Sequence, residues 1–325
     1  MKKVISIGEA LIDFIPNRTE CDLKDVSSFE RVCGGAPTNV SAVVSKLGGN
    51  SQIITKLGED AFGDYIVDTL NSINVDTSSI LRTKDANTCL AFVSLKKDGN
   101  REFSFYRNPS ADMLLNMEEI KSSWFKDIGA LHFCSVALVE SPMKYAHIKA
   151  IDIAKEHNAI ISFDPNIRLP LWKSHQSCKD TINQYLKYAD LLKISNEEVD
   201  FITGMGIDEA SKILLKGNLK MILYSMGKDG AMVITKDGKV KVSGVDVNAL
   251  DTTGAGDSII GAFLYCLSRD SITSSELETL PLVKLEEYLR FANYYSAYSV
   301  LGRGAIDSYA TLNQIENFIS KHKDR

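Results

Sequence analysis

A glycine-rich segment that runs straight into an apolar stretch is the strongest chemical signal in the sequence. Residues 251–257 read DTTGAGD and are followed by SIIGAFLYCL, which has the composition of a buried helix. A glycine turn that enters a helix leaves backbone N–H groups unpaired and adds the positive end of the helix dipole, so it is suited to bind phosphate. Asp257 would stand beside those amides and accept a proton from a hydroxyl that attacks the phosphoryl group. The other interpretation, a capped turn whose glycines supply positive φ, stays open.

A second segment could bind a small ligand. Residues 34–39 read GGAPTN and open a helical pattern. Its two glycines permit a close backbone approach, and Asn39 has both a donor and an acceptor, although taken alone the segment is a helix-capping turn. The standard nucleotide motifs are missing: the sequence has no G-x-x-x-x-G-K-[ST] run, and Ile259 stands where a dinucleotide fingerprint beginning at Gly254 would need its third glycine.

Strand-like and helix-like segments alternate along the chain that must position these groups. Apolar runs typical of buried strands occur at 4–14, 52–57, 130–138, 159–164, 191–195 and 220–225. Segments with helical spacing of apolar residues separate them, at 38–47, 62–73, 143–157, 178–189 and 208–216. The alternation predicts a mostly parallel sheet with helices on both faces, in one α/β domain over residues 1–325.

Two hairpins depart from this pattern. Residues 89–107 contain two β-rich segments around Asp98-Gly99, which is a strong hairpin signal. The runs 231–235 and 239–245 predict an antiparallel hairpin at the sheet edge, and helical segments at 257–269, 283–301 and 311–321 close the chain. We therefore expect a small β lid, formed from residues near 14–34 and 86–110, beside the main sheet.

Composition narrows the class of protein. The formal net charge of −5 gives no reason to expect binding to nucleic acid or to an anionic membrane. Six cysteines form no CxxC pair and only five histidines accompany them, so we expect reduced thiols in a cytoplasmic protein and no structural zinc site. The first apolar run contains Glu9 and Asp13, which favours a buried strand over a signal peptide.

In combination the motifs resemble the ribokinase-like (PfkB-type) carbohydrate kinases. Residues 34–39, Leu47-Gly48, Gly58-x-Asp60-x-x-Gly63 and residues 251–257 occur in the order typical of that family. The segments FYRNPSAD (105–112) and DPNIRLPLW (164–172) look most like its fructokinase branch. The resemblance implies a three-layer α/β/α sandwich with a mostly parallel sheet and a small β lid. It also implies transfer of the γ-phosphoryl group of ATP to a sugar hydroxymethyl group, with Mg²⁺ as cofactor and fructose as the expected substrate.

The resemblance assigns roles to matching positions. Asp257 would be the base, and the anion hole would consist of the amides of Gly254, Ala255 and Gly256. The positions that would hold the sugar are Asp13, Gly34, Gly35, Asn39, Arg107 and Arg168. Each side chain also has a structural alternative: Asp13 as a turn former, Arg107 as a solvated lid residue and Arg168 in a structural ion pair.

Further positions match the nucleotide and cation sites of the family. The nucleotide set comprises Lys193, Glu198, Ser225, Gly227, Gly230 and Asn293. Glu198 takes the glutamate place of the N-x-x-E motif of the family. Ser195 stands where that motif has its asparagine, so the neighbouring Asn196 is not assigned a role. Asn293 is explained equally well as a polar position on a long helix. The matching ligands for K⁺ are Asp251, Thr253, Ser299, Gly302, Gly304 and Ser308. Hard oxygen ligands of this kind suit K⁺ better than a transition metal.

Other functions remain open at this point. Within the same class, 2-keto-3-deoxygluconate kinases share the arginine-bearing lid and the D-x-N-x-R segment. From a different class, the chain could be a non-catalytic sugar- or nucleotide-binding regulator, although the GAGD run at 254–257 is intact. A homodimer formed through the lid is the expected assembly.

Overall fold

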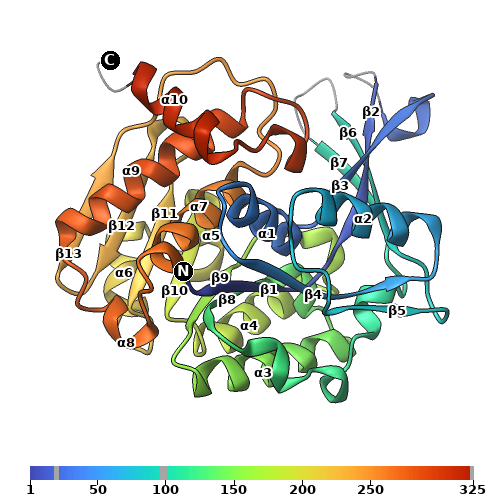
Figure 1. Ribbon diagram of the computed structural model, residues 1–325, viewed down its shortest axis with the longest axis horizontal. Coiled ribbons are helices and arrows are strands. Elements are labelled where there is room, and N and C mark those ends of the chain that lie inside the picture. The colour runs from blue at the N-terminus through green and yellow to red at the C-terminus, as the bar shows by residue number, and fades with distance from the viewer. Residues whose placement is uncertain (18–21, 96–100, 323–325) are drawn as a thin grey trace.

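The main structural unit is a large sheet between two layers of helices (Figure 1). The computed structural model describes residues 1–17, 22–95 and 101–322. Nine strands pair in the order β13-β12-β11-β10-β9-β8-β1-β4-β5, and all neighbours are parallel except the β11–β12 and β12–β13 pairs. The strands are β1 (Lys3–Ile7), β4 (Ser51–Gly58), β5 (Ile80–Thr83), β8 (Ile128–Cys134), β9 (Ile160–Asp164), β10 (Leu191–Ser195), β11 (Met221–Ser225), β12 (Ala231–Thr235) and β13 (Gly238–Val242).

Helices cover both faces because the central strands are apolar on both sides. Val4 of β1 belongs to one hydrophobic cluster, and Ile5 and Ile7 belong to the other. The first cluster includes residues of α1 (Ala36–Lys46), α2 (Ala61–Ser72), α7 (Ala255–Arg269), α8 (Ser274–Leu277), α9 (Leu282–Ser299) and α10 (Leu312–His322). The second includes residues of α3 (Pro142–Glu156), α4 (His175–Leu186), α5 (Asn196–Thr203) and α6 (Ile207–Leu214). The expected three-layer α/β/α arrangement is confirmed.

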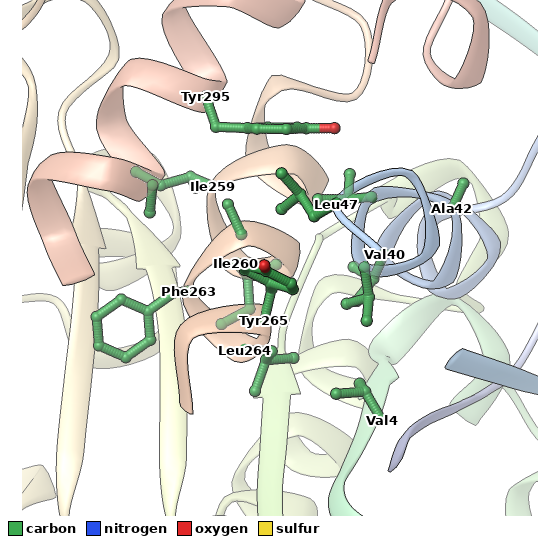
Figure 2. Packing of buried hydrophobic residues seen from close by; sticks show 14 of the residues in the cluster. Val4, Val40, Ala42, Leu47, Ile259, Ile260, Phe263, Leu264, Tyr265 and Tyr295 are labelled. Carbon is green, nitrogen blue, oxygen red and sulfur yellow. The ribbon is translucent and has the colours of Figure 1, made fainter. Parts of the chain in front are cut away.

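Helices α1 and α7 approach each other unusually closely. An added Cβ at Gly261 of α7 would lie 2.8 Å from Cβ of Val43 of α1, so only glycine fits this crossing. Figure 2 shows the apolar side chains around it, contributed by Val40 and Leu47 on one helix and Ile260 on the other. Since Asn39 meets Asp257 four residues before Val43 meets Gly261 on each helix, the two helices run in the same direction. Their N-termini therefore lie together.

A second, separate sheet occupies the place of the expected lid. Its order is β3-β2-β6-β7, with β2 antiparallel to β3, parallel to β6, and β6 antiparallel to β7. The strands are β2 (Leu11–Pro16), β3 (Phe29–Gly34), β6 (Cys89–Leu95) and β7 (Arg101–Tyr106). They stand beyond one end of the main sheet in Figure 1. The β6–β7 pairing confirms the expected hairpin, whose Asp98-Gly99 turn lies outside the described residues.

The N-terminal run differs from the sequence-based expectation. Residues 4–14 were expected to form one strand, but β1 ends at Ile7 in the main sheet and β2 begins at Leu11 in the lid sheet. Gly8 between them has φ 147°, and an added Cβ there would lie 2.7 Å from Cγ of Pro37. The chain can therefore turn tightly against the start of α1 and leave one sheet for the other.

Other segments agree with the expectation in type and differ in their bounds: the run expected at 130–138 is strand only to Cys134, and the run expected at 239–245 is strand only to Val242. The edge hairpin is formed by β12 and β13, and the closing helices are α7, α9 and α10. In the part of the chain that the structure describes, no helix has the length and apolar character needed to cross a membrane.

Candidate active site

A buried carboxylate joins the two helix N-termini. Asp257 is the third residue of α7 and is 8% exposed, and its Oδ2 accepts a hydrogen bond of 2.8 Å from Nδ2 of Asn39 on α1. Burial raises the pKa of Asp257, while the Asn39 bond and the charges of Lys193 and Arg168 oppose the rise. The result is a fixed carboxylate that is more basic than one on the surface.

A tyrosine from the C-terminal part of the chain fixes the turn before α7. Gly254 has the left-handed φ of 74°, and its carbonyl accepts a hydrogen bond of 3.0 Å from the Tyr309 hydroxyl. An added Cβ at Gly254 would lie 2.3 Å from that hydroxyl oxygen, so a side chain is excluded by both space and conformation. Of the three expected amides, the Ala255 N–H donates a long hydrogen bond of 3.3 Å to the Thr252 carbonyl.

Gly256 has a different reason to be glycine. The interpretation that the glycines of this turn supply positive φ is wrong for Gly256, which lies within α7 and has no left-handed φ. An added Cβ there would lie 3.1 Å from Nζ of Lys193. The close approach of this ammonium group to the first turn of α7, rather than backbone strain, is what a side chain at Gly256 would disturb.

Three ionisable side chains meet beneath that turn. Nζ of Lys193 on β10 lies 3.0 Å from Oδ2 of Asp164 at the end of β9 and 3.9 Å from Oε2 of Glu198 on α5. Burial raises the pKa of Asp164 to about 7, partly offset by Lys193. Burial also acts to raise the pKa of Glu198, but Lys193 and two backbone N–H groups outweigh it and lower that pKa. The ammonium group is thus enclosed by carboxylates at the carboxyl ends of neighbouring parallel strands, where α/β proteins bind ligands.

Glu198 organises two loops. Its Oε1 accepts from the Ile167 N–H at 3.1 Å and its Oε2 from the Ser195 N–H at 2.8 Å. Ser195 caps α5 in return, accepting from the Glu198 N–H, whereas the Asn196 side chain accepts a hydrogen bond from the hydroxyl of Tyr224. Ser195 and Glu198 therefore act as a reciprocal pair, and Asn196 points elsewhere.

Arg168 follows directly after this anchored backbone. Its side chain is exposed and donates one hydrogen bond to the Ile167 carbonyl. Within residues 1–17, 22–95 and 101–322 it forms no salt bridge, so the structural ion pair considered as an alternative is absent from the described residues. Its charge nevertheless reaches Asp257 and lowers the pKa of that carboxyl.

The glycines at the lid root pack against protein atoms. An added Cβ at Gly34 would lie 2.1 Å from Oδ2 of Asp13, and one at Gly35, whose φ is 106°, would lie 2.4 Å from the Glu9 carbonyl oxygen. The Asp13 carboxylate therefore lies directly over Gly34. On β2, Asp13 pairs with Ala91 of β6, which in turn pairs with Phe105 of β7, so these three share one face of the lid sheet.

Arg107 is buried and fixed rather than solvated. Its Nε and Nη2 donate to Oδ2 of Asp112 at 3.0 and 2.6 Å, and its Nη1 donates to the Val136 carbonyl at 2.7 Å. Its side chain is only 3% exposed. The alternative of a solvated lid residue is therefore wrong, and Arg107 ties the end of β7 to the main body.

Two of the nucleotide-side positions, Gly230 and Asn293, contact the end of β13 and the segment after it. Gly227 and Gly230 have positive φ in the turn that follows Ser225, and an added Cβ at Gly230 would lie 2.1 Å from the Val242 carbonyl oxygen. Asn293 of α9 is buried and donates a 2.9 Å hydrogen bond to the Ser243 carbonyl. These residues brace the chain that leads from β13 toward residue 251.

The expected cation ligands lie together. Oδ1 of Asp251 accepts from the Thr253 N–H at 2.9 Å and from its hydroxyl at 2.6 Å, and Oδ2 accepts from the Gly304 N–H at 3.0 Å. An added Cβ at Gly302 would lie 2.8 Å from Cβ of Ser308. The ligand expected from Ser299 is its backbone carbonyl, and the Ser299 hydroxyl bonds to Ser258 and Ser296. The oxygen-rich loops at 251–253 and 302–308 are therefore adjacent, as a hard monovalent cation requires.

Two residues of the site were not expected from the sequence. Tyr309 holds the Gly254 carbonyl, and Glu9 lies beneath the Gly34-Gly35 turn. Tyr309 carries no local signal, because its contact spans 55 positions. Glu9 does have a local signal, since it is a charged residue inside an apolar run, but that signal by itself indicates only that the run is not a signal peptide.

Comparison with known proteins agrees with this geometry. The model of the pfkB family of carbohydrate kinases matches residues 1–312. A curated protein from Arabidopsis thaliana, probable fructokinase-2, is 41% identical over 310 residues that cover 95% of this chain and 93% of that protein. The crystal structure of a fructokinase from Xylella fastidiosa with bound ATP superimposes with a TM-score of 0.92 at 30% identity, covering 99% of both chains.

A further solved structure is similar over nearly its full length. It is a double mutant of the fructokinase from Vibrio cholerae O395 with bound fructose, ADP and potassium ion, with a TM-score of 0.86, 29% identity and 98% coverage of each chain. The family match spans far more than half of the sequence, and the curated relative is well above 30% identical. The chain therefore belongs to the pfkB family of carbohydrate kinases.

Proposed function

We propose that this carbohydrate kinase is an ATP-dependent fructokinase, which transfers the γ-phosphoryl group of ATP to the 6-hydroxymethyl group of D-fructose. The observation that carries the proposal is the buried Asp257 carboxylate, fixed by Asn39 at the joint N-termini of α1 and α7. The relatives named fructokinase, one of them with fructose and ADP and another with ATP, support the choice of substrates.

In the proposed reaction Asp257 accepts the proton of the sugar hydroxyl while the oxygen of that hydroxyl attacks the γ-phosphorus. The new O–P bond forms while the bond between the γ-phosphorus and the bridging oxygen breaks, and ADP leaves. The raised pKa of Asp257 makes this carboxylate a better base than an ordinary one. The backbone amides at 254–256 and the ammonium group of Lys193 stabilise the charge that develops on the phosphoryl oxygens.

ATP would bind at the carboxyl ends of the parallel strands, on the side of the sheet where β11 lies. The turn after Ser225, with Gly227 and Gly230, lies at the carboxyl end of that strand, and Asn293 braces the neighbouring segment. Mg²⁺, when bound, neutralises charge on the phosphates. Asp164 and Glu198, the largely buried carboxylates beside Lys193, would bind its hydration shell.

The lid sheet would complete the sugar site. It carries Asp13 on the same face as Phe105, and Gly34 lies directly under the Asp13 carboxylate. Asp13, Asn39 and the backbone at Gly34 and Gly35 would hold sugar hydroxyls. Covering the site would exclude water, which otherwise competes with the sugar for the phosphoryl group.

A substrate screen tests the proposal directly. Phosphoryl transfer from ATP should be measured with fructose, ribose, 2-keto-3-deoxygluconate and inosine, with ADP release as the common readout. We expect the highest kcat/KM with fructose. A clear preference for 2-keto-3-deoxygluconate would make the chain a kinase of that sugar acid, and binding of sugars without any transfer would indicate a regulator.

Asp257→Asn should lower kcat by about 10²-fold or more, because general base catalysis typically contributes 10²–10⁴-fold. The amide keeps the shape of the side chain, so folding and ATP affinity should change little. Steady-state kinetics and calorimetric ATP titration measure both quantities. Asp152→Asn, an exposed carboxylate on α3, is the matched control. Near wild-type kcat in Asp257→Asn would contradict the assignment of the base.

Gly254→Val should abolish transfer, since valine strains the left-handed backbone and collides with the Tyr309 hydroxyl. Gly256→Val should also be inactive, but through displacement of Lys193, so the smaller Gly256→Ala should keep measurable activity. At Gly217 an added Cβ would lie 3.9 Å from its nearest neighbour, the Leu214 carbonyl oxygen, so Gly217→Val serves as control. Folded and active valine variants at both 254 and 256 would argue against the proposed anion hole.

Potassium should activate the enzyme. If the loops at 251–253 and 302–308 hold a monovalent cation beside the anion hole, as the potassium-bound relative suggests, kcat should rise when K⁺ replaces tetramethylammonium at constant ionic strength. The reason is that the cation would order the turn that leads into α7. Equal rates in the two salts would show that Asp251 orders these loops by its hydrogen bonds alone.

The lid is also the proposed dimer contact. Strand β7 is an edge strand of the lid sheet, and its Tyr106 is 64% exposed beside Phe92. Light scattering should give the mass of a dimer, and Tyr106→Glu should shift it toward the monomer. A monomeric mass for the wild type at micromolar concentration would rule this assembly out.

A further inference from the structure

The lid sheet is connected to the main body at a small number of chain crossings. Residues 8–10 join β1 to β2, Gly35 joins β3 to α1, and Arg107 follows β7. Any movement of the lid relative to the main sheet must be absorbed at such crossings, because the strands on either side are paired within their own sheets. Glu9 lies in the middle of the first crossing.

Glu9 binds the first crossing to the second. Its Oε1 accepts a hydrogen bond of 3.2 Å from the Ala36 N–H at the start of α1. Its carbonyl oxygen accepts a 3.0 Å bond from the Thr38 hydroxyl and packs on Gly35, where an added Cβ would come within 2.4 Å. Both the backbone and the side chain of Glu9 thus hold the segment that connects the lid to α1.

Glu9 also interacts with the crossing after β7. Arg107, fixed there by Asp112 and the Val136 carbonyl, is the charged group that most lowers the pKa of Glu9, and Asp112 acts in the opposite direction. The buried thiols of Cys89 on β6 and Cys134 on β8 also interact electrostatically with Glu9. Two crossings therefore meet at Glu9, and the charges that fix the third crossing act on its carboxyl group.

The position is costly for a carboxyl group. Glu9 is 2% exposed, and its Oε2 has no hydrogen-bond partner among the described residues. Burial raises its pKa to about 7. A buried, incompletely satisfied carboxyl group destabilises a fold relative to a well-packed apolar side chain. Packing alone gives no reason for a glutamate at this place.

We propose that Glu9 is a positioning residue that locks the base of the lid and thereby sets the sugar-binding geometry. Asp13 stands four residues after Glu9 on β2, and Asn39 stands three residues after Ala36 on α1. Because less than one helical turn separates Ala36 from Asn39, a displaced helix start also displaces the hydrogen bond to Asp257. The sugar-binding part of this inference rests on the proposed function, whereas the locking of the lid does not.

Kinetics of Glu9→Ala and Glu9→Gln test the positioning role. Loss of the acceptor in Glu9→Ala should raise KM for fructose by about 10-fold while KM for ATP changes by less than about 2-fold, since only the sugar side is displaced. Glutamine still accepts from the Ala36 N–H, so Glu9→Gln should show a smaller rise, about 3-fold. Ser45→Ala removes the bond from Ser45 to the Ile73 carbonyl at the other end of α1 and should leave both KM values unchanged.

Hydrogen exchange provides a readout that needs no substrate. Amides of β2 and β6 should exchange faster in both Glu9 variants than in the wild type, while those of β9, β10 and β11 keep their wild-type rates. A purely structural role would instead accelerate exchange in the main sheet as well, and that result would overturn the proposal. Unchanged lid exchange in folded Glu9→Gln, with unchanged KM for fructose, would overturn it too.

The two proposals can fail separately. If the wild type does not phosphorylate fructose, the proposed function fails, but the exchange rates of the lid strands still decide whether Glu9 locks the lid. If the wild type is a fructokinase and both variants match it in lid exchange and in KM for fructose, only the positioning role fails. Should Glu9→Ala not fold, Glu9→Gln alone carries both measurements.

Discussion

The hydrogen bond between Asn39 and Asp257 is the contact on which the rest of the site depends. It joins the N-termini of α1 and α7, which reach it from segments 218 positions apart. The bond can form because Gly261 lets the two helices approach until Val43 touches the bare backbone. Parallel helices that meet at their N-termini also direct the positive ends of both dipoles to one place, where a phosphoryl group would carry developing charge.

Charge beneath this contact is balanced within a few ångströms. Lys193 lies between Asp164 and Glu198, all three largely buried at the ends of adjacent strands. Removing one member would leave a buried charge uncompensated, which typically costs about 3–5 kcal/mol. Such a group is a poor means of stabilising a fold, since apolar side chains would serve at least as well. In the proposed mechanism it holds an ammonium group against the first turn of α7 with no reorganisation required.

Several residues of the lid that match ligand-binding positions in the sequence make contacts within the protein instead. Gly34 and Gly35 are required by contacts with Asp13 and Glu9. The guanidinium group of Arg107 donates hydrogen bonds to Asp112 and to the Val136 carbonyl. Its contribution to sugar binding in the proposed mechanism is therefore largely to fix the end of β7. In the proposed mechanism, a rigid base and a separate sheet would let the lid meet the sugar in one orientation, which is the preorganisation that tight binding of a small polar ligand demands.

The sequence by itself determined those features whose physical cause is local. The edge hairpin of β12 and β13, the helix that begins after Gly254 and the alternation of strands and helices all follow from periodicity and turn chemistry within a few residues. The break between β1 and β2 was not found, because alternation of apolar residues does not reveal which of two sheets a strand joins. Only the tertiary structure decided that Gly256 faces Lys193, that Asn293 holds Ser243 and that Glu9 joins the crossings of the lid. These contacts link positions 27 to 63 residues apart, and no local pattern encodes them, because they arise when parallel strands bring their carboxyl ends to one edge of the sheet.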